Sequence, residues 1–114
     1  MATYLEAKQR IDDNPKIFEG LKKRQTREFL AWLPDNMHIV NAFGKAALYL
    51  KQRVHREYYS AYCIREKIRW DSMLSEIGTE YKISNNMTPF VSRLIMALRP
   101  NELKGMFRIK CGGE

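Results

Sequence analysis

Four prolines divide this chain of 114 residues into helix-length segments. Pro15 and Pro89 each follow a residue that is a good helix N-cap, and proline at the first helical position loses no hydrogen bond. Pro34 and Pro100 follow apolar stretches with helical spacing, and the residue before a proline is pushed out of the helical region. The prolines therefore predict one helix between the first two of them and another between the last two.

Capping residues and apolar spacing predict three further helices. Thr3 and Glu6 form a capping box, in which each side chain satisfies a free backbone N–H group. Ser60 is a suitable N-cap for a later helix, and Gly78 is a natural stop for it. We expect helices over about residues 3–11, 15–33, 36–53, 61–77 and 89–99. The expected core of the fourth of these is Cys63, Ile64, Ile68, Met73, Leu74 and Ile77.

Short β-branched or alternating runs predict extended segments between these helices. Residues 54–59 are expected to form one extended edge, and residues 81–83 and 107–109 can pair as a hairpin. From residue 36 the general order of elements is that of a winged helix-turn-helix. We therefore expect a mainly α fold, a helical domain with a small C-terminal β-hairpin that is winged helix-turn-helix-like. A plain helical bundle with a small hairpin is the alternative.

The length and composition are those of one globular domain. Hydrophobic residues make up 45% of the chain and charged residues 29%, and 114 residues are too few for two separate cores. We expect a single domain over 1–114, with N-terminal helices in 1–33 and the winged-helix-like part in 34–110. The apolar residues of segment 15–33 also allow a homodimer, held by Phe18, Leu21, Phe29 and Trp32.

The charge is strongly basic and unevenly distributed. Twenty Lys and Arg residues outnumber thirteen Asp and Glu residues, which gives a formal net charge of +7. Residues 36–114 hold thirteen of the basic and seven of the acidic residues. A basic excess of this kind favours a polyanionic partner, such as DNA or a nucleoprotein complex.

In a winged helix-turn-helix, helix 61–77 would cross the DNA backbone and helix 89–99 would enter the major groove. Residues near the start of the second helix would contact base edges or phosphates, and basic residues on the strands would contact phosphates. The predicted nucleic-acid-binding residues are Lys82, Asn85, Asn86, Thr88, Ser92, Arg93, Arg108 and Lys110.

Each of these features also has a structural interpretation. Asn85 and Asn86 can form a turn whose amides bond nearby backbone, and Arg93 can pair with a neighbouring acid. The adjacent Arg69 and Trp70 can form a surface on which a base stacks, or Trp70 can lie in the core while Arg69 is solvated.

No motif of catalysis or metal binding is present in the sequence. The chain has no Gly-rich phosphate loop, no GxSxG and no HExxH, and its two cysteines and two histidines lack ligand spacing. Cys63 and His55 are the one conceivable nucleophile and base, without an evident third partner. We expect no catalysis, no metal and no cofactor. No apolar run is long enough for a membrane span and the start has no signal-peptide pattern, so we expect a cytoplasmic protein with no membrane partner and with free thiols.

The chain from about residue 32 to residue 110 resembles a family of small uncharacterised proteins of phages, prophages and bacterial genomes. The resemblance lies in Tyr59-Ser60-Ala61, Ile68-Arg69-Trp70, Tyr81-Lys82-Ile83-Ser84-Asn85-Asn86, Ser92-Arg93-Leu94 and Arg99-Pro100. Ser84 replaces the first Asn of the family's Asn-Asn-Asn run, and residues 106–110 lack the acid of its C-terminal motif. The resemblance implies a phage or mobile-element setting in a bacterial host cell, and it supplies no activity.

These observations favour a non-enzymatic DNA-binding protein, a phage or mobile-element regulator that uses helix 89–99 and the flanking strand. The alternative is a phage-encoded inhibitor that binds a host protein or nucleoprotein machine, of the anti-defence or anti-CRISPR type. A small interaction or structural subunit is a third hypothesis.

Overall fold

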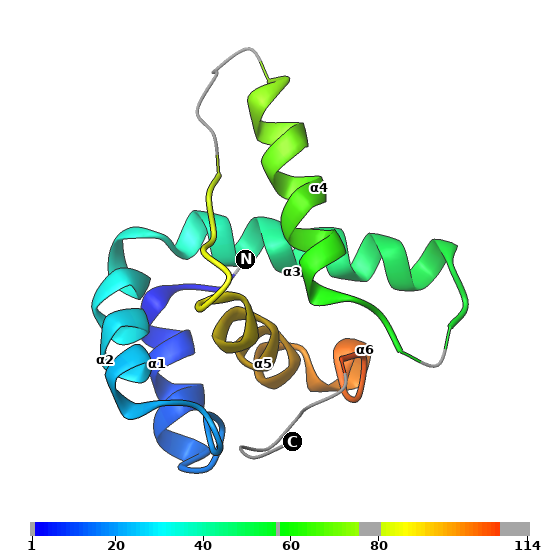
Figure 1. Ribbon diagram of the computed structural model, residues 1–114. Coiled ribbons are helices and arrows are strands. Elements are labelled where there is room, and N and C mark those ends of the chain that lie inside the picture. The colour runs from blue at the N-terminus through cyan, green and yellow to red at the C-terminus, as the bar shows by residue number, and fades with distance from the viewer. Residues whose placement is uncertain (1, 57, 76–80, 108–114) are drawn as a thin grey trace.

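The computed structural model describes residues 2–56, 58–75 and 81–107 (Figure 1). The regular secondary structure of these residues is entirely helical. Six α-helices and one 3-10 helix follow each other along the chain: α1 (Tyr4–Asp13), α2 (Lys23–Trp32), η1 (Leu33–Asp35), α3 (Met37–Arg53), α4 (Ala61–Met73), α5 (Thr88–Leu98) and α6 (Pro100–Leu103).

Helix α5 forms the centre of the fold. It contacts α1, α3, α4 and α6, and in Figure 1 the other helices lie around it. Every residue from Phe90 to Met96 is buried, on all sides of the helix. A helix made mostly of apolar residues requires such an enclosed position, and its polar Ser92 and Arg93 are hydrogen-bonded within the fold. The expected helix 89–99 is therefore confirmed, but as the core of the molecule.

An aromatic cluster joins the N-terminal segment to α5. The ring centroid of Phe90 lies 5.0 Å from that of Phe18 and 5.2 Å from that of Phe29. Trp32 stacks on Phe29 at 5.8 Å, and Leu21 packs partly buried against the same core. The four residues expected to hold a homodimer thus pack against the core of one chain, and the homodimer itself stays a prediction.

The side chain of Arg93 ties α5 to the turns that follow α1. Its Nη1 donates to the backbone oxygens of Ile17, at 3.2 Å, and Glu19, at 2.6 Å. Gly20 follows with φ of 88°, a left-handed conformation that favours glycine. The expected helix start at residue 15 is therefore wrong, because these carbonyls accept from Arg93, and α2 begins only at Lys23.

Several expected helix boundaries are confirmed. The Thr3 hydroxyl accepts from the backbone N–H of Glu6 at 3.2 Å, and the Ser60 hydroxyl accepts from that of Cys63 at 3.4 Å. Helix α3 covers the expected range and ends at Arg53. Helix α4 ends earlier than expected, at Met73, and the proposed stop at Gly78 lies outside the described residues.

The predicted β-hairpin and winged helix-turn-helix are wrong. Residues 81–83 are described and form no strand. Their backbone bonds to side chains of α4 instead: the N–H of Tyr81 donates to the Ser72 hydroxyl at 2.8 Å, and the Ile83 oxygen accepts from Arg65. Phe107 is buried, and residues 108–110 lie outside the described part of the chain. The mainly α character is confirmed.

The segment between α3 and α4 is fixed by Tyr59. Its hydroxyl donates to the backbone oxygen of Val54 and accepts from the N–H of Arg56 at 3.2 Å. Its own N–H donates to the oxygen of Met106 at 3.1 Å. These bonds set the point from which α4 leaves the body of the molecule.

We predict that Arg93→Ala lowers the free energy of unfolding by about 2 to 4 kcal/mol, because two backbone carbonyl oxygens lose their donor and a buried side chain is removed. Urea denaturation followed by circular dichroism measures this change. The control is Arg24→Ala, whose side chain is 85% exposed and pairs with Glu28. This control is expected to change stability by less than about 0.5 kcal/mol. Equal effects of the two substitutions would contradict a structural role for Arg93.

Candidate nucleic-acid interface

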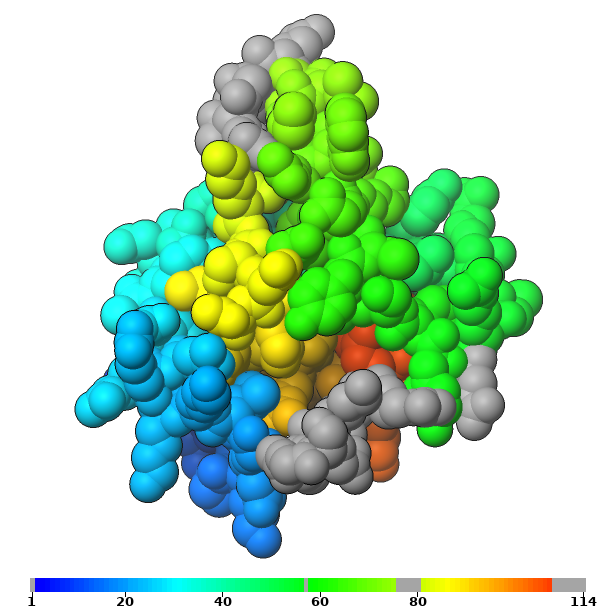
Figure 2. Space-filling view, in the orientation of Figure 1, coloured from blue at the N-terminus to red at the C-terminus, as the bar shows by residue number. Residues whose placement is uncertain are grey.

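Helix α4 packs on the body of the molecule through one narrow stripe. Its buried residues are Ile64, Ile68 and Ser72, which repeat every four residues. In Figures 1 and 2 the helix projects away from the other helices. Because one stripe is enough to attach it, most of the circumference of α4 faces solvent.

The solvent face of α4 is unusually apolar. Tyr62 is 47% exposed, Trp70 59%, Met73 46% and Leu74, just after the helix, 78%. The expectation that Cys63, Met73 and Leu74 lie in the core is wrong, and so is the core interpretation of Trp70. Large apolar side chains gathered on one exposed face mark a binding surface more often than single exposed ones do.

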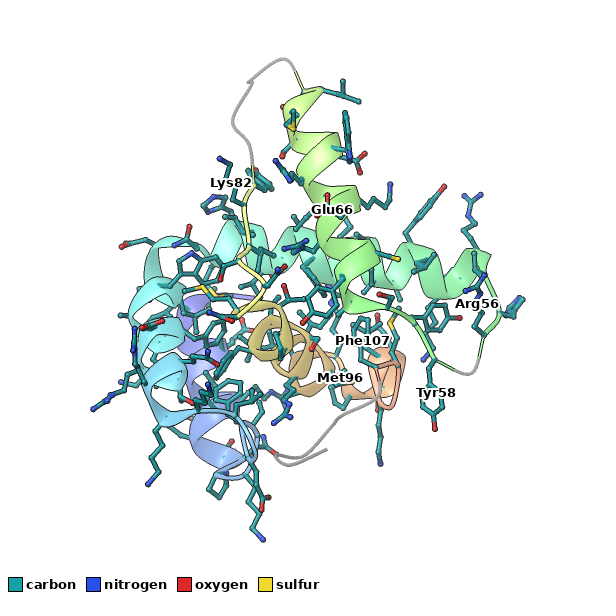
Figure 3. All side chains as sticks on the ribbon, in the orientation of Figure 1. Arg56, Tyr58, Glu66, Lys82, Met96 and Phe107 are labelled. Atoms are coloured by element: carbon teal, nitrogen blue, oxygen red, sulfur yellow. The ribbon has the colours of Figure 1, made fainter. Side chains whose placement is uncertain are left out.

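Basic residues gather on one flank of this helix, beside residues 81–86. Arg65 and Arg69 lie four residues apart and so share a side of α4. Together with Lys82 they line a polar hollow of about 340 Å³, whose other walls are Glu66, Tyr81, Ile83 and Ser84. We call Arg65, Arg69 and Lys82 the basic pocket. In Figure 3, Lys82 lies beside α4 on the segment that leads into α5.

Residues 81–83 line the basic pocket, and contacts with α3 and α4 hold them in place. The ring of Tyr81 meets His38 of α3 edge-on, with centroids 5.2 Å apart, and the N–H of Tyr81 bonds to α4 as described. Ile83 is buried. Residues 81–83 are therefore fixed between α3 and α4, and Lys82, which lies between these two anchors, is exposed.

Arg65 is the most constrained member of the basic pocket. Its Nη1 donates to the Ile83 oxygen at 3.4 Å and to the amide oxygen of Asn85, and its Nη2 donates to Glu66 at 2.7 Å. Its Nε is buried without a hydrogen-bond partner. Glu66 also lies 3.9 Å from Arg69. Among the described residues, the hollow is lined by three cations, Arg65, Arg69 and Lys82, and by one carboxylate, Glu66. A lining of this composition suits an anion such as phosphate.

Three of the predicted binding residues lie at or beside this site. Lys82, Asn85 and Asn86 are exposed, and Asn85 accepts from Arg65. Asn85 and Asn86 also form the turn before α5 that was the structural alternative. Arg108 and Lys110 lie outside the described residues.

The other three predicted residues are buried and serve the fold. The Thr88 hydroxyl donates to the Ser84 oxygen at 3.0 Å, and that of Ser92 to the Pro89 oxygen at 2.9 Å. Arg93 is 6% exposed and donates to the carbonyls that follow α1. All three residues also line a hollow of about 550 Å³ between α5 and the residues around Tyr59. Their contact with nucleic acid stays a prediction.

Arg65 was not among the predicted binding residues, whereas Arg69 and Trp70 were given two interpretations, a base-stacking surface or a solvated arginine beside a core tryptophan. The signal that could have found them is the spacing within α4. The buried stripe of Ile64 and Ile68 continues to Ser72, and Trp70 falls far from this stripe on a helical projection. Drawing this stripe on the sequence would have placed Trp70 and Arg69 on the surface.

A second hollow, of about 450 Å³, lies between α3 and α4 on the other side of the helix. Ala42, Ala46 and Ile68 line it together with the charged Lys45 and Lys67. At its edge two cationic groups lie over the ring of Tyr49, that of Arg53 at 4.8 Å and that of Lys67 at 5.6 Å from the ring centroid. Asp71 also lines this hollow and pairs with Lys67 at 3.0 Å, so this side of α4 carries charges of both signs.

Neither a metal site nor a membrane span is found in the described residues. No three of their His, Cys, Asp or Glu side chains are grouped so that they could bind a metal ion. None of their helices combines the length and the hydrophobicity that crossing a membrane requires. Comparisons with protein-family models, with curated proteins and with solved structures found no match to this chain.

We predict that the two tryptophans differ in their accessibility to acrylamide. Trp32 stacks on the core and is partly buried, whereas Trp70 is mostly exposed. The Trp32→Phe variant, which emits from Trp70 alone, should give a larger Stern–Volmer constant than the Trp70→Phe variant. Equal quenching of the two variants would mean that the face of α4 is covered in solution.

Proposed function

We propose that this chain is a non-enzymatic nucleic-acid-binding protein that uses α4 and residues 81–86. The observation that carries the proposal is the basic pocket, in which Arg65, Arg69 and Lys82 come together from two parts of the chain around one hollow. Arginine presents a planar fork of donors that matches phosphate oxygens, and lysine adds a point charge. The net charge of +7 adds long-range attraction for a polyanion.

The proposal keeps the class of ligand that the sequence favours and changes the element that binds it. Helix α5 is enclosed, whereas α4 exposes most of its surface. Lys82 and Asn85, both expected to bind nucleic acid, stay in the proposed site. A regulator in a phage or mobile element, as the resemblance implies, is the biological setting that we propose for this binding.

An inhibitor that binds a host nucleoprotein machine is the second candidate. The exposed Trp70, Met73 and Leu74 beside the basic pocket favour it, because Trp, Met and Arg are enriched in protein interfaces. Leu74 separates the candidates: a protein interface would depend on this side chain, whereas phosphate binding depends on Arg69 and Lys82.

We predict that the double variant Arg69→Ala with Lys82→Ala weakens binding of a labelled oligonucleotide about tenfold at low salt. The slope of log K against log salt should fall by about two, since two phosphate contacts are lost. Fluorescence anisotropy at several salt concentrations measures both quantities.

The matched control is Lys8→Ala with Arg27→Ala, which removes the same two residue types from exposed positions on α1 and α2. This control should keep the affinity within about twofold, because the loss of net charge is equal but lies away from the pocket. If both double variants weaken binding equally, the attraction is diffuse and the basic pocket is not the site. If the unaltered protein binds no nucleic acid at low salt, the proposed function is wrong.

A further inference from the structure

We infer that the nucleic acid is single-stranded, with one base stacked on Trp70 and a neighbouring phosphate held in the basic pocket. The inference rests on the proposed nucleic-acid binding and adds the type of strand and the contact that selects it. Its basis is the position of an exposed aromatic ring next to a cationic hollow on one projecting helix.

Trp70 directly follows Arg69, so the two side chains leave α4 at about 100° from each other. The indole is 59% exposed, and the Arg69 side chain 47%. An exposed indole presents a flat π surface, and unpaired bases stack on such surfaces whatever their sequence. A phosphate at Arg69 would therefore bring its base within reach of the indole ring of Trp70.

The composition of the solvent face of α4 argues against a duplex. Helices that read a major groove carry donors such as Arg, Asn and Gln at the base edges. The solvent face of α4 instead offers Tyr62, Trp70 and Met73, with the carboxylate of Glu66 among them. In Figure 3, Glu66 lies on the part of α4 turned toward the viewer. In a duplex the bases are paired and stacked on each other, so these aromatic side chains would find no unpaired base to stack on.

A single strand fits the same arrangement better, because it presents both a charged backbone and unpaired aromatic bases. Proteins that bind single strands combine these two elements, basic side chains along the backbone and aromatic rings under the bases. Arg65 is already oriented by Ile83 and Asn85, so this part of the phosphate site is formed before the ligand arrives. Preformed sites lose less side-chain freedom on binding.

The experiment compares a labelled oligothymidine of about 12 nucleotides with a duplex of equal length, by fluorescence anisotropy. We expect the single strand to bind at least about tenfold more tightly than the duplex. Trp70→Ala should weaken single-strand binding about tenfold, and Trp70→Phe should keep it within about threefold, because the phenyl ring still stacks. Each variant is first checked by circular dichroism, and the exposure of Trp70 means that the fold should be unchanged.

Leu74→Ala is the matched control, since it removes an exposed apolar side chain from the same end of α4 without removing a π surface. It should leave single-strand affinity within about twofold. A direct readout comes from the Trp32→Phe variant, in which emission from Trp70 alone should be quenched as the oligothymidine binds.

Three results would overturn the inference. Tighter binding of the duplex, or equal losses in the Ala and Phe variants at Trp70, would mean that no base stacks there. A loss at Leu74 as large as that at Trp70 would indicate an apolar docking face for a protein. If any of these results appears while the Arg69 and Lys82 variant still weakens binding, the proposed function stands and only the strand type is wrong. If no oligonucleotide binds, both fail together.

Discussion

The buried guanidinium of Arg93 is the interaction on which the rest of this structure depends. It extends from the central helix to two carbonyls of the turns after α1, and so joins the segment 15–20 to α5. A buried charge is costly unless it is fully hydrogen-bonded, so the turns must present their carbonyls in one arrangement. That arrangement excludes a helix at residues 15–20 and directs Phe18 into the aromatic cluster with Phe29 and Phe90.

With α5 at the centre, the molecule has to bind its ligands elsewhere. Helices α1, α2 and α3 use their apolar faces against the core, whereas α4 needs only the stripe of Ile64, Ile68 and Ser72. The same arrangement holds residues 81–83 between α3 and α4, which puts Lys82 opposite Arg65 and Arg69. The candidate interface is thus a consequence of how little of α4 is needed for packing.

Capping residues and apolar spacing predicted most of the helices. They did not predict which side chains are buried or which segments contact each other. Thr3 and Ser60 cap helices as expected, because capping depends on a few neighbouring residues. Helix α5 also begins near Pro89, but the expected cap Thr88 lies inside the helix and no side chain caps it. Residues 81–83 do not form the expected strand, because their backbone is hydrogen-bonded to side chains of α4, which are distant in sequence. Arg93 was expected to contact a ligand. No local pattern shows that two carbonyl oxygens, more than seventy residues away in the sequence, will accept hydrogen bonds from it. Of the candidate site, Lys82, Asn85 and Asn86 were predicted as binding residues, and Arg69 was named with Trp70 as one of two alternatives. Arg65 required the helical projection of α4.

The narrow attachment of α4 also separates the determinants of stability from those of recognition. Substitutions at Tyr62, Trp70 or Met73 change what the helix presents while the stripe that anchors it stays intact. Such a surface is evolvable: its ligand preference can diverge between descendants, or be redesigned in the laboratory, without passing through unfolded intermediates. Arg65 is the exception, because its bonds to Ile83 and Asn85 serve both the fold and the pocket. Variation in a lineage of such proteins would therefore be expected around this arginine rather than at it.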